Sequence, residues 1–193
     1  MAYVTPGTVA AGDVATAAAW NVVVGDIVNL RALANVVGTT KTDTFSESVV
    51  AGGSSALVTG LTATITPTSA TSKILVHGFV TVGFSVAGDQ RVFVQLERNQ
   101  PSANTRIAVG DAAGSRKRVT AASSQIVSLT DLTSVPFCIL DSPATTSTII
   151  YSMTLSHGSG ATRTIYVNQD AANSDSSAYS RSVSSIIVQE IPA

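Results

Sequence analysis

The feature that most constrains the fold is an alternation of apolar and polar residues, which recurs from about residue 39 to the end of the chain. Because neighbouring side chains of a β-strand point to opposite faces, this period of two predicts strands with one buried face. The clearest runs are 61–66, 74–86, 91–97 and 149–156. Further candidates are 43–50, 116–121, 125–132, 164–168 and 183–191.

Residues that favour turns separate these runs. They lie at 51–54, 67–69, 87–89, 112–114 and 158–160. Many short strands with regular turn signals, and with no helical crossover between them, favour antiparallel sheets over a parallel α/β sheet. The sequence therefore predicts a mainly β fold: an antiparallel β-sandwich or jelly-roll-like domain, preceded by one N-terminal α-helix.

The predicted helix begins near Thr16, a suitable N-cap, and is expected to end near Gly38. Apolar residues recur along it at alternating spacings of three and four, which is typical of a heptad seam. The seam consists of Trp20, Val23, Ile27, Leu30, Ala34 and Val37. We therefore divide the chain into an N-terminal attachment segment and helix, residues 1–38, and a β-sandwich domain, residues 39–193.

This helix needs a partner, because an isolated helix of its length is only marginally stable in water. One partner is a second copy of the helix, and the other is the β-domain of the same chain. Self-association is the hypothesis that we carry forward. The predicted oligomer interface then consists of Trp20, Val23, Ile27, Leu30 and Ala34.

The composition indicates a protein of assemblies rather than a freely diffusing enzyme. Charged residues make up only 12% of the chain, about half the usual share. A net charge of −1 gives no support for nucleic-acid binding, which needs a basic surface. No apolar run approaches the length of a membrane span, and the N-terminus lacks the pattern of a signal peptide. We therefore expect neither nucleic-acid binding nor membrane insertion.

The side chains that could carry chemistry are scattered. His77 and His157 lack the spacing of paired metal ligands. The Asn- and Asp-rich stretch 168–175 is interpreted as turns rather than as a calcium loop, and the basic run 116–118 as a solvated strand start. Cys138 lies in an apolar run and is expected to be a buried structural thiol. We predict no enzyme activity, no catalytic or cofactor-binding residues, no cofactor and no metal.

Three tyrosines raise the alternative of a glycan-binding surface. Tyr151, Tyr166 and Tyr179 could line a shallow surface of this kind, although tyrosines of a sandwich more often lie at the edge of the core.

Two parts of the chain resemble bacteriophage virion proteins. The opening YVTPGTVAAGDVATAAAWN, residues 3–21, is similar to the N-termini of many phage tail-fibre and other structural proteins, except that Trp20 replaces their usual aliphatic residue. The segments ITPTSATSKILV (65–76), LDSP (140–143) and YSRSVSSI (179–186) are similar to a β-domain that recurs in phages. The opening and the β-domain that contains these segments together span most of the chain.

The resemblance implies a virion component, a homotrimer with a proximal attachment segment and a distal β-knob, and no catalytic residues. Its function would be that of a short tail-associated fibre, docked on tail, baseplate or neck proteins, with the knob facing a host surface glycan. The alternative is a capsid decoration or cement protein that stabilises the coat lattice. A glycan-degrading enzyme would need paired carboxylates in a cleft, and the sequence identifies no such pair.

Overall fold

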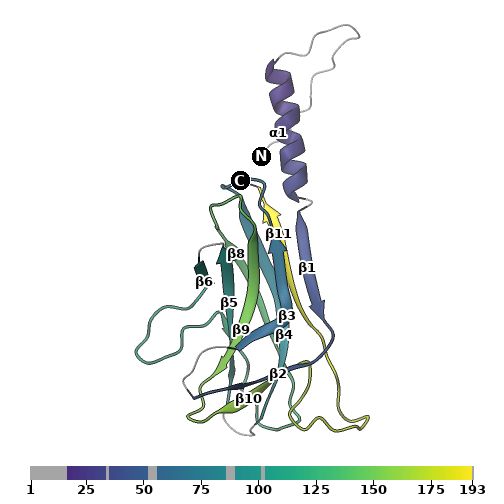
Figure 1. The fold of residues 1–193 in the computed structure, drawn as a ribbon, viewed down its shortest axis with the longest axis vertical. Coiled ribbons are helices and arrows are strands. Elements are labelled where there is room, and N and C mark those ends of the chain that lie inside the picture. Colours follow the sequence, from purple (N-terminus) through teal and green to yellow (C-terminus); the bar gives the residue numbers. More distant parts are fainter. Residues whose placement is uncertain (1–16, 34, 52–55, 86–89, 101–102, 193) are drawn as a thin grey trace.

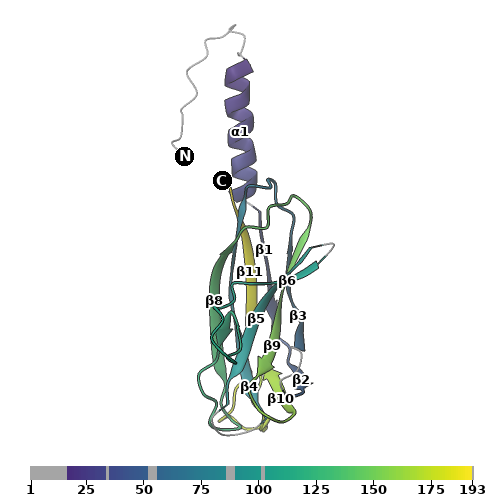
Figure 2. The ribbon, with the colours of Figure 1, turned by 90° about the vertical axis from the view of Figure 1, so that its left-hand side faces the viewer.

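The structure is a computed structural model, which describes residues 17–33, 35–51, 56–85, 90–100 and 103–192. Two antiparallel sheets pack face to face, and one helix, α1 (Ala17–Leu33), projects from one end (Figures 1 and 2). The prediction of a mainly β sandwich preceded by one helix is therefore confirmed. No helix among the described residues has the length and apolar character needed to cross a membrane.

The first sheet, called sheet A, is built around the long strand β4. One side of β4 pairs with β8, and the other side pairs first with β11 and then with β10. Strands β1 and β2 pair with β11 and β10 and form the far edge. The strands are β1 (Val36–Lys41), β2 (Phe45–Val49), β4 (Lys73–Phe84), β8 (Thr133–Asp141), β10 (Arg163–Val167) and β11 (Ser184–Ile191).

The second sheet, called sheet B, has the order β3-β9-β5-β6, and a short strand, β7, also pairs with β5. The pairing of β3 with β9 contains a register shift between Leu57 and Thr62. The strands are β3 (Ala56–Ile65), β5 (Val92–Gln100), β6 (Ala103–Ile107), β7 (Ala121–Ala122) and β9 (Ile149–His157).

The core lies between the two sheets and follows the alternation in the sequence. In β4 the even-numbered apolar residues from Ile74 to Phe84 are fully buried, and in β9 the odd-numbered residues from Ile149 to Leu155 are. Side chains of the opposite parity point away from the core. Apolar burial of this kind is the main source of the stability of the sandwich.

The chain enters the sandwich earlier than the sequence predicted. Helix α1 ends at Leu33 and strand β1 begins at Val36, so Val37 packs against the core rather than on the helix. The physical reason is that residues 36–41 pair with β11, which satisfies their backbone hydrogen bonds and places Val37 against the core. The proposed division at residue 38 therefore falls inside β1. Ala34, a predicted seam residue, lies outside the described residues.

Other strand predictions also differ from the structure. Strand β6 was not predicted, and β8 was recognised only as an apolar run. Residues 116–120 and 125–132 form no strand, apart from an isolated bridge between Gln90 and Ile126. Cys138 is exposed, so the expectation of a buried thiol was wrong. In β8 the alternation turns Val135 and Phe137 inward and therefore turns Cys138 outward.

Candidate functional site: an assembly surface

Helix α1 continues the long direction of the sandwich, beyond the end of β11 (Figures 1 and 2). Its 17 residues give a length of about 25 Å. Three alanines open the helix, and its first turn contains no acidic residue. The helix leads through Asn35 directly into β1, so it is attached to sheet A.

The apolar side chains of α1 are exposed in the single chain. Trp20 is 59% exposed, Ile27 47% and Leu30 64%, and Val23 is exposed as well. The sandwich therefore does not cover these four predicted interface residues, which argues against packing on the chain's own domain. Their role in self-association stays a prediction.

Polar contacts around the buried Glu190 hold the chain where α1 leaves the sandwich. The Asn35 Nδ2 donates to Glu190 Oε2 at 2.7 Å and to the Thr66 carbonyl at 3.0 Å. The Glu190 backbone N–H donates to the Asn35 carbonyl at 3.0 Å. The other carboxylate oxygen accepts from the Thr68 backbone N–H and hydroxyl, at 2.8 and 2.7 Å.

Glu190 is fully buried, yet it is held in the ionised form. Burial alone would raise the pKa of its carboxyl group. The hydrogen bonds from Thr68 and Asn35 stabilise the carboxylate and outweigh that effect, so the pKa of Glu190 is lowered. A buried anion at the end of β11 thus ties together the base of the helix and the turn before β4.

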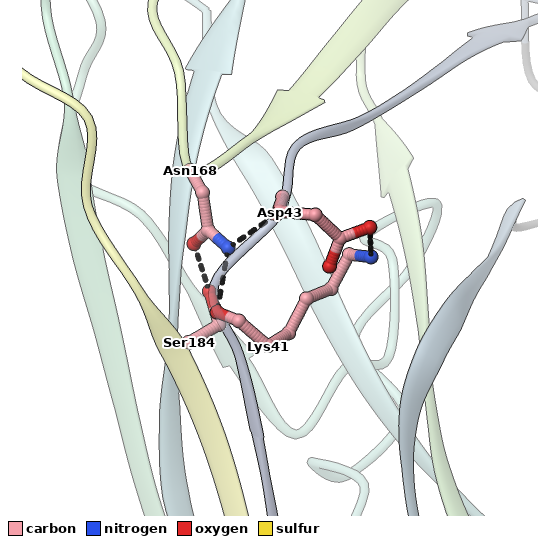
Figure 3. Close-up of polar contacts among 4 residues, drawn as sticks. All are labelled: Lys41, Asp43, Asn168 and Ser184. Atoms are coloured by element: carbon pink, nitrogen blue, oxygen red, sulfur yellow. Dashed lines mark hydrogen bonds and ion pairs between the residues drawn. The ribbon is translucent and has the colours of Figure 1, made fainter.

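A second polar cluster holds the other end of β1 (Figure 3). The Asn168 backbone has a φ of 61°, and its side-chain amide donates to the carbonyls of Lys41 and Asp43 at 2.9 Å each. The Ser184 hydroxyl donates to Asn168 Oδ1 at 2.6 Å. The Lys41 ammonium pairs with Asp43 at 2.8 Å, and this hydrogen bond lowers the pKa of the Asp43 carboxyl. Strand β1 is therefore fixed at both ends, and Lys41 already has a partner.

The outer face of sheet A carries three rows without a charged side chain, and the exposed Lys73 borders them on the side of α1. The register aligns three cross-strand rows over β8, β4, β11 and β1. The rows are Leu140–Leu75–Gln189–Val36, Cys138–His77–Ile187–Gly38 and Pro136–Phe79–Ser185–Thr40. None of these positions is Asp, Glu, Lys or Arg. We call these three rows the A face.

The A face is also partly hollow. Leu75, His77, Phe79, Pro136 and Cys138 contribute to a shallow depression in it. Leu140 and Val36, at the end near α1, are 53% and 49% exposed. Exposed apolar side chains gathered on one face in this way are typical of an interaction surface.

The outer face of sheet B is polar instead. The register places Gln95 beside Thr154 and Glu97 beside Ser152. Glu97 accepts a hydrogen bond from Thr154 at 3.3 Å and pairs with Arg106 at 3.7 Å. The two faces therefore differ in chemistry: the A face is uncharged over its three rows, whereas this face of sheet B is polar and includes the ion pair of Glu97 with Arg106.

The structure does not bring the predicted reactive residues together. His157 is buried, with its Nε2 2.9 Å from the Val49 carbonyl and its ring against Phe84, whereas His77 lies on the A face. Within the described ranges there is no group of three His, Cys, Asp or Glu residues that could hold a metal. The basic run 116–118 is exposed in the loop between β6 and β7, not at a strand start.

The three tyrosines do not form one surface. Tyr151 is fully buried, Tyr166 is half-buried on β10, and Tyr179 is exposed in the loop before β11. Tyr151 belongs to a polar contact between the sheets that no motif in the sequence indicates. Its hydroxyl donates to Asp141 at 2.7 Å, and Arg98 Nη1 donates to both oxygens of that carboxylate at 2.8 Å. Burial and the hydrogen bond to Asp141 both raise the pKa of Tyr151.

Comparison with known proteins adds only a distant likeness in fold. No protein-family model and no curated protein matches the chain. Solved structures of infectious bursal disease virus are similar: the Gx strain has a TM-score of 0.41 and the VP2 subviral particle 0.40, each with 15% sequence identity. These alignments cover 82% of this chain but only 37% and 38% of the viral chains. A likeness of this degree does not establish a shared function.

Proposed function

We propose that the chain is a structural protein of a virus particle, a homotrimer that assembles through helix α1. The observation that carries this proposal is the exposure of Trp20, Ile27 and Leu30 on a helix that projects from the sandwich. Exposed apolar surface on a lone helix is costly in water, and a bundle of such helices removes it. The resemblance of residues 3–21 to phage virion proteins supports the same assignment.

The A face supplies a second contact for this assembly. Because α1 is attached to sheet A, bundling of the helices brings copies of this sheet close together. The three rows contain no charged side chain, so these rows of neighbouring copies approach without repulsion between like charges, with Lys73 at their border. Packing of these faces around the threefold axis also covers the exposed Leu140 and Val36.

Within the virion, we favour the role of a short tail-associated fibre. The helix occupies one end of an elongated sandwich, which leaves the opposite end to face outward (Figure 1). The number of copies per particle tests this role. Tens of copies fit a fibre, whereas hundreds of copies on tailless capsids would indicate a decoration protein.

The mass of the purified protein in solution, measured by light scattering or native mass spectrometry, tests the assembly. We expect three times the chain mass of 19.7 kDa. Replacing both Trp20 and Leu30 by alanine should give a monomer, because the seam then loses its two largest contacts. Val24→Ala is the matched control, since Val24 is 54% exposed on α1 but lies off the seam.

Three results would overturn the proposal. A wild-type monomer would remove its basis, and an unchanged trimer in the double variant would show that the seam is not the contact. If the Val24→Ala variant dissociated to the same extent as the double variant, the helices would contact one another through a side other than the predicted seam. Circular dichroism of each variant confirms that the sandwich remains folded.

A further inference from the structure

A polar pocket lies at the end of the sandwich opposite α1. The loop 168–183 connects β10 to β11, and β11 runs from this loop to the base of the helix at Glu190. The pocket has a volume of about 380 Å³ and lies within this loop. Its lining includes Gln169, Asp170, Asn173, Asp175, Tyr179 and Arg181.

Contacts to the rest of the domain and within the loop hold this pocket in shape. The backbone N–H groups of Ala171 and Ala172 donate to the Leu129 carbonyl at 2.9 and 3.1 Å. Asp170 is buried and accepts from the Asn173 N–H at 2.6 Å. The Arg181 guanidinium donates to the side chains of Gln169 and Asn173. Ordered loops of this length without regular structure usually serve a function.

We propose that this pocket binds a neutral saccharide. The inference rests on the proposed function, because a sugar site far from the assembly helix faces outward from the particle. The volume lies within the range of small-molecule sites, and it suits one or two sugar rings. The lining offers carboxylate and amide acceptors, guanidinium and hydroxyl donors, and the exposed ring of Tyr179.

The charge and polarity of the lining favour this class of ligand over others. Two aspartates and one arginine leave the lining with a net negative charge, which disfavours phosphate and acidic sugars. Apart from the Tyr179 ring, the lining offers no large apolar side chain for a lipid tail. Hydroxyl groups of a neutral sugar match the mixed donors and acceptors, and a tyrosine ring packs against the apolar face of a sugar.

Saturation-transfer NMR on the full chain, with glucose, galactose, mannose and rhamnose as probes, tests the proposal. N-acetylneuraminic acid is the charged comparison. We expect at least one neutral sugar to bind in the millimolar range. Tyr179→Ala and Asp175→Asn should each weaken that binding by about tenfold, because each removes one main contact. Asp111→Asn, in the exposed loop between β6 and β7, is the matched control and should leave binding unchanged.

The proposal is overturned if none of the neutral sugars binds, or if only the acidic sugar does. It is also overturned if binding survives both pocket variants or is lost equally in the control. The mass of the protein in solution separates these results from a failure of the assembly proposal, because neither pocket residue lies on α1 or the A face.

Discussion

Asn35 and Glu190 bind each other through both side chain and backbone, where the helix meets the sandwich. The amide of Asn35 donates to the Glu190 carboxylate at 2.7 Å, and the backbone N–H of Glu190 donates to the Asn35 carbonyl at 3.0 Å. These contacts join Asn35, the residue before β1, to Glu190, the second-last residue of β11. The start of β1, next to the end of α1, is therefore held by the last strand of the fold.

This junction predicts a pH dependence of stability. The pKa of Glu190 in the folded protein lies below its ordinary value of 4.5. The carboxylate therefore stabilises the fold above that pH, and its contribution is lost as the pH falls through the lower, folded value. Glu190→Gln should flatten the dependence of the unfolding free energy on pH below about 4.5. The exposed Glu47, replaced in the same way, is the control, and an equal effect there would contradict the prediction.

The contact between Arg98 and Asp141 predicts a large effect of one substitution. The two side chains are 16% and 10% exposed, and they join strands β5 and β8 of opposite sheets. Asp141→Ala leaves the Arg98 charge buried without its carboxylate, so the unfolding free energy should fall by about 3 kcal/mol. Denaturant unfolding measures this, and the exposed Asp111→Ala should change it by less than about 0.5 kcal/mol.

Gly78 allows β4 and β11 to approach closely. A Cβ at this position would lie 2.1 Å from the Ser185 carbonyl oxygen, which is backbone and cannot rotate away. Gly78→Ala should therefore lower the unfolding free energy by about 3 kcal/mol or prevent folding. Gly160→Ala is the control, because a Cβ at Gly160 meets nothing within 4 Å. A stable Gly78→Ala protein would show that the two strands can separate at little cost.

The thiol of Cys138 reports on the A face. It is free and exposed in the single chain, beside His77 in the register. If copies of the protein pack through this face, a maleimide should modify Cys138 at least about tenfold faster in the Trp20 and Leu30 double variant than in the wild type. Equal rates in the folded proteins would exclude the A face from the contact. Urea-unfolded samples, which expose the thiol fully, normalise the rates.

The sequence alone determined the class of fold, because the period of side-chain alternation is a local property. The runs 74–86 and 149–156 predicted strands that the structure confirms as β4 and β9. The lack of a helical crossover between the predicted strands favoured antiparallel sheets over a parallel α/β sheet. The three- and four-residue spacing from Trp20 to Leu30 predicted a helix that the structure also contains.

Tertiary structure decided what local patterns leave open. The helix ends before Val36 because this valine and Val37 pair with β11, which is distant in the sequence. Cys138 is exposed because its two neighbours in β8 fill the core, and an apolar run does not reveal which parity points inward. The junction of Asn35 with Glu190 and the pocket around Tyr179 each depend on contacts that only folding brings together. A sequence specifies the preference of each segment, but the partners of a buried carboxylate or the walls of a pocket are set by strand order and register.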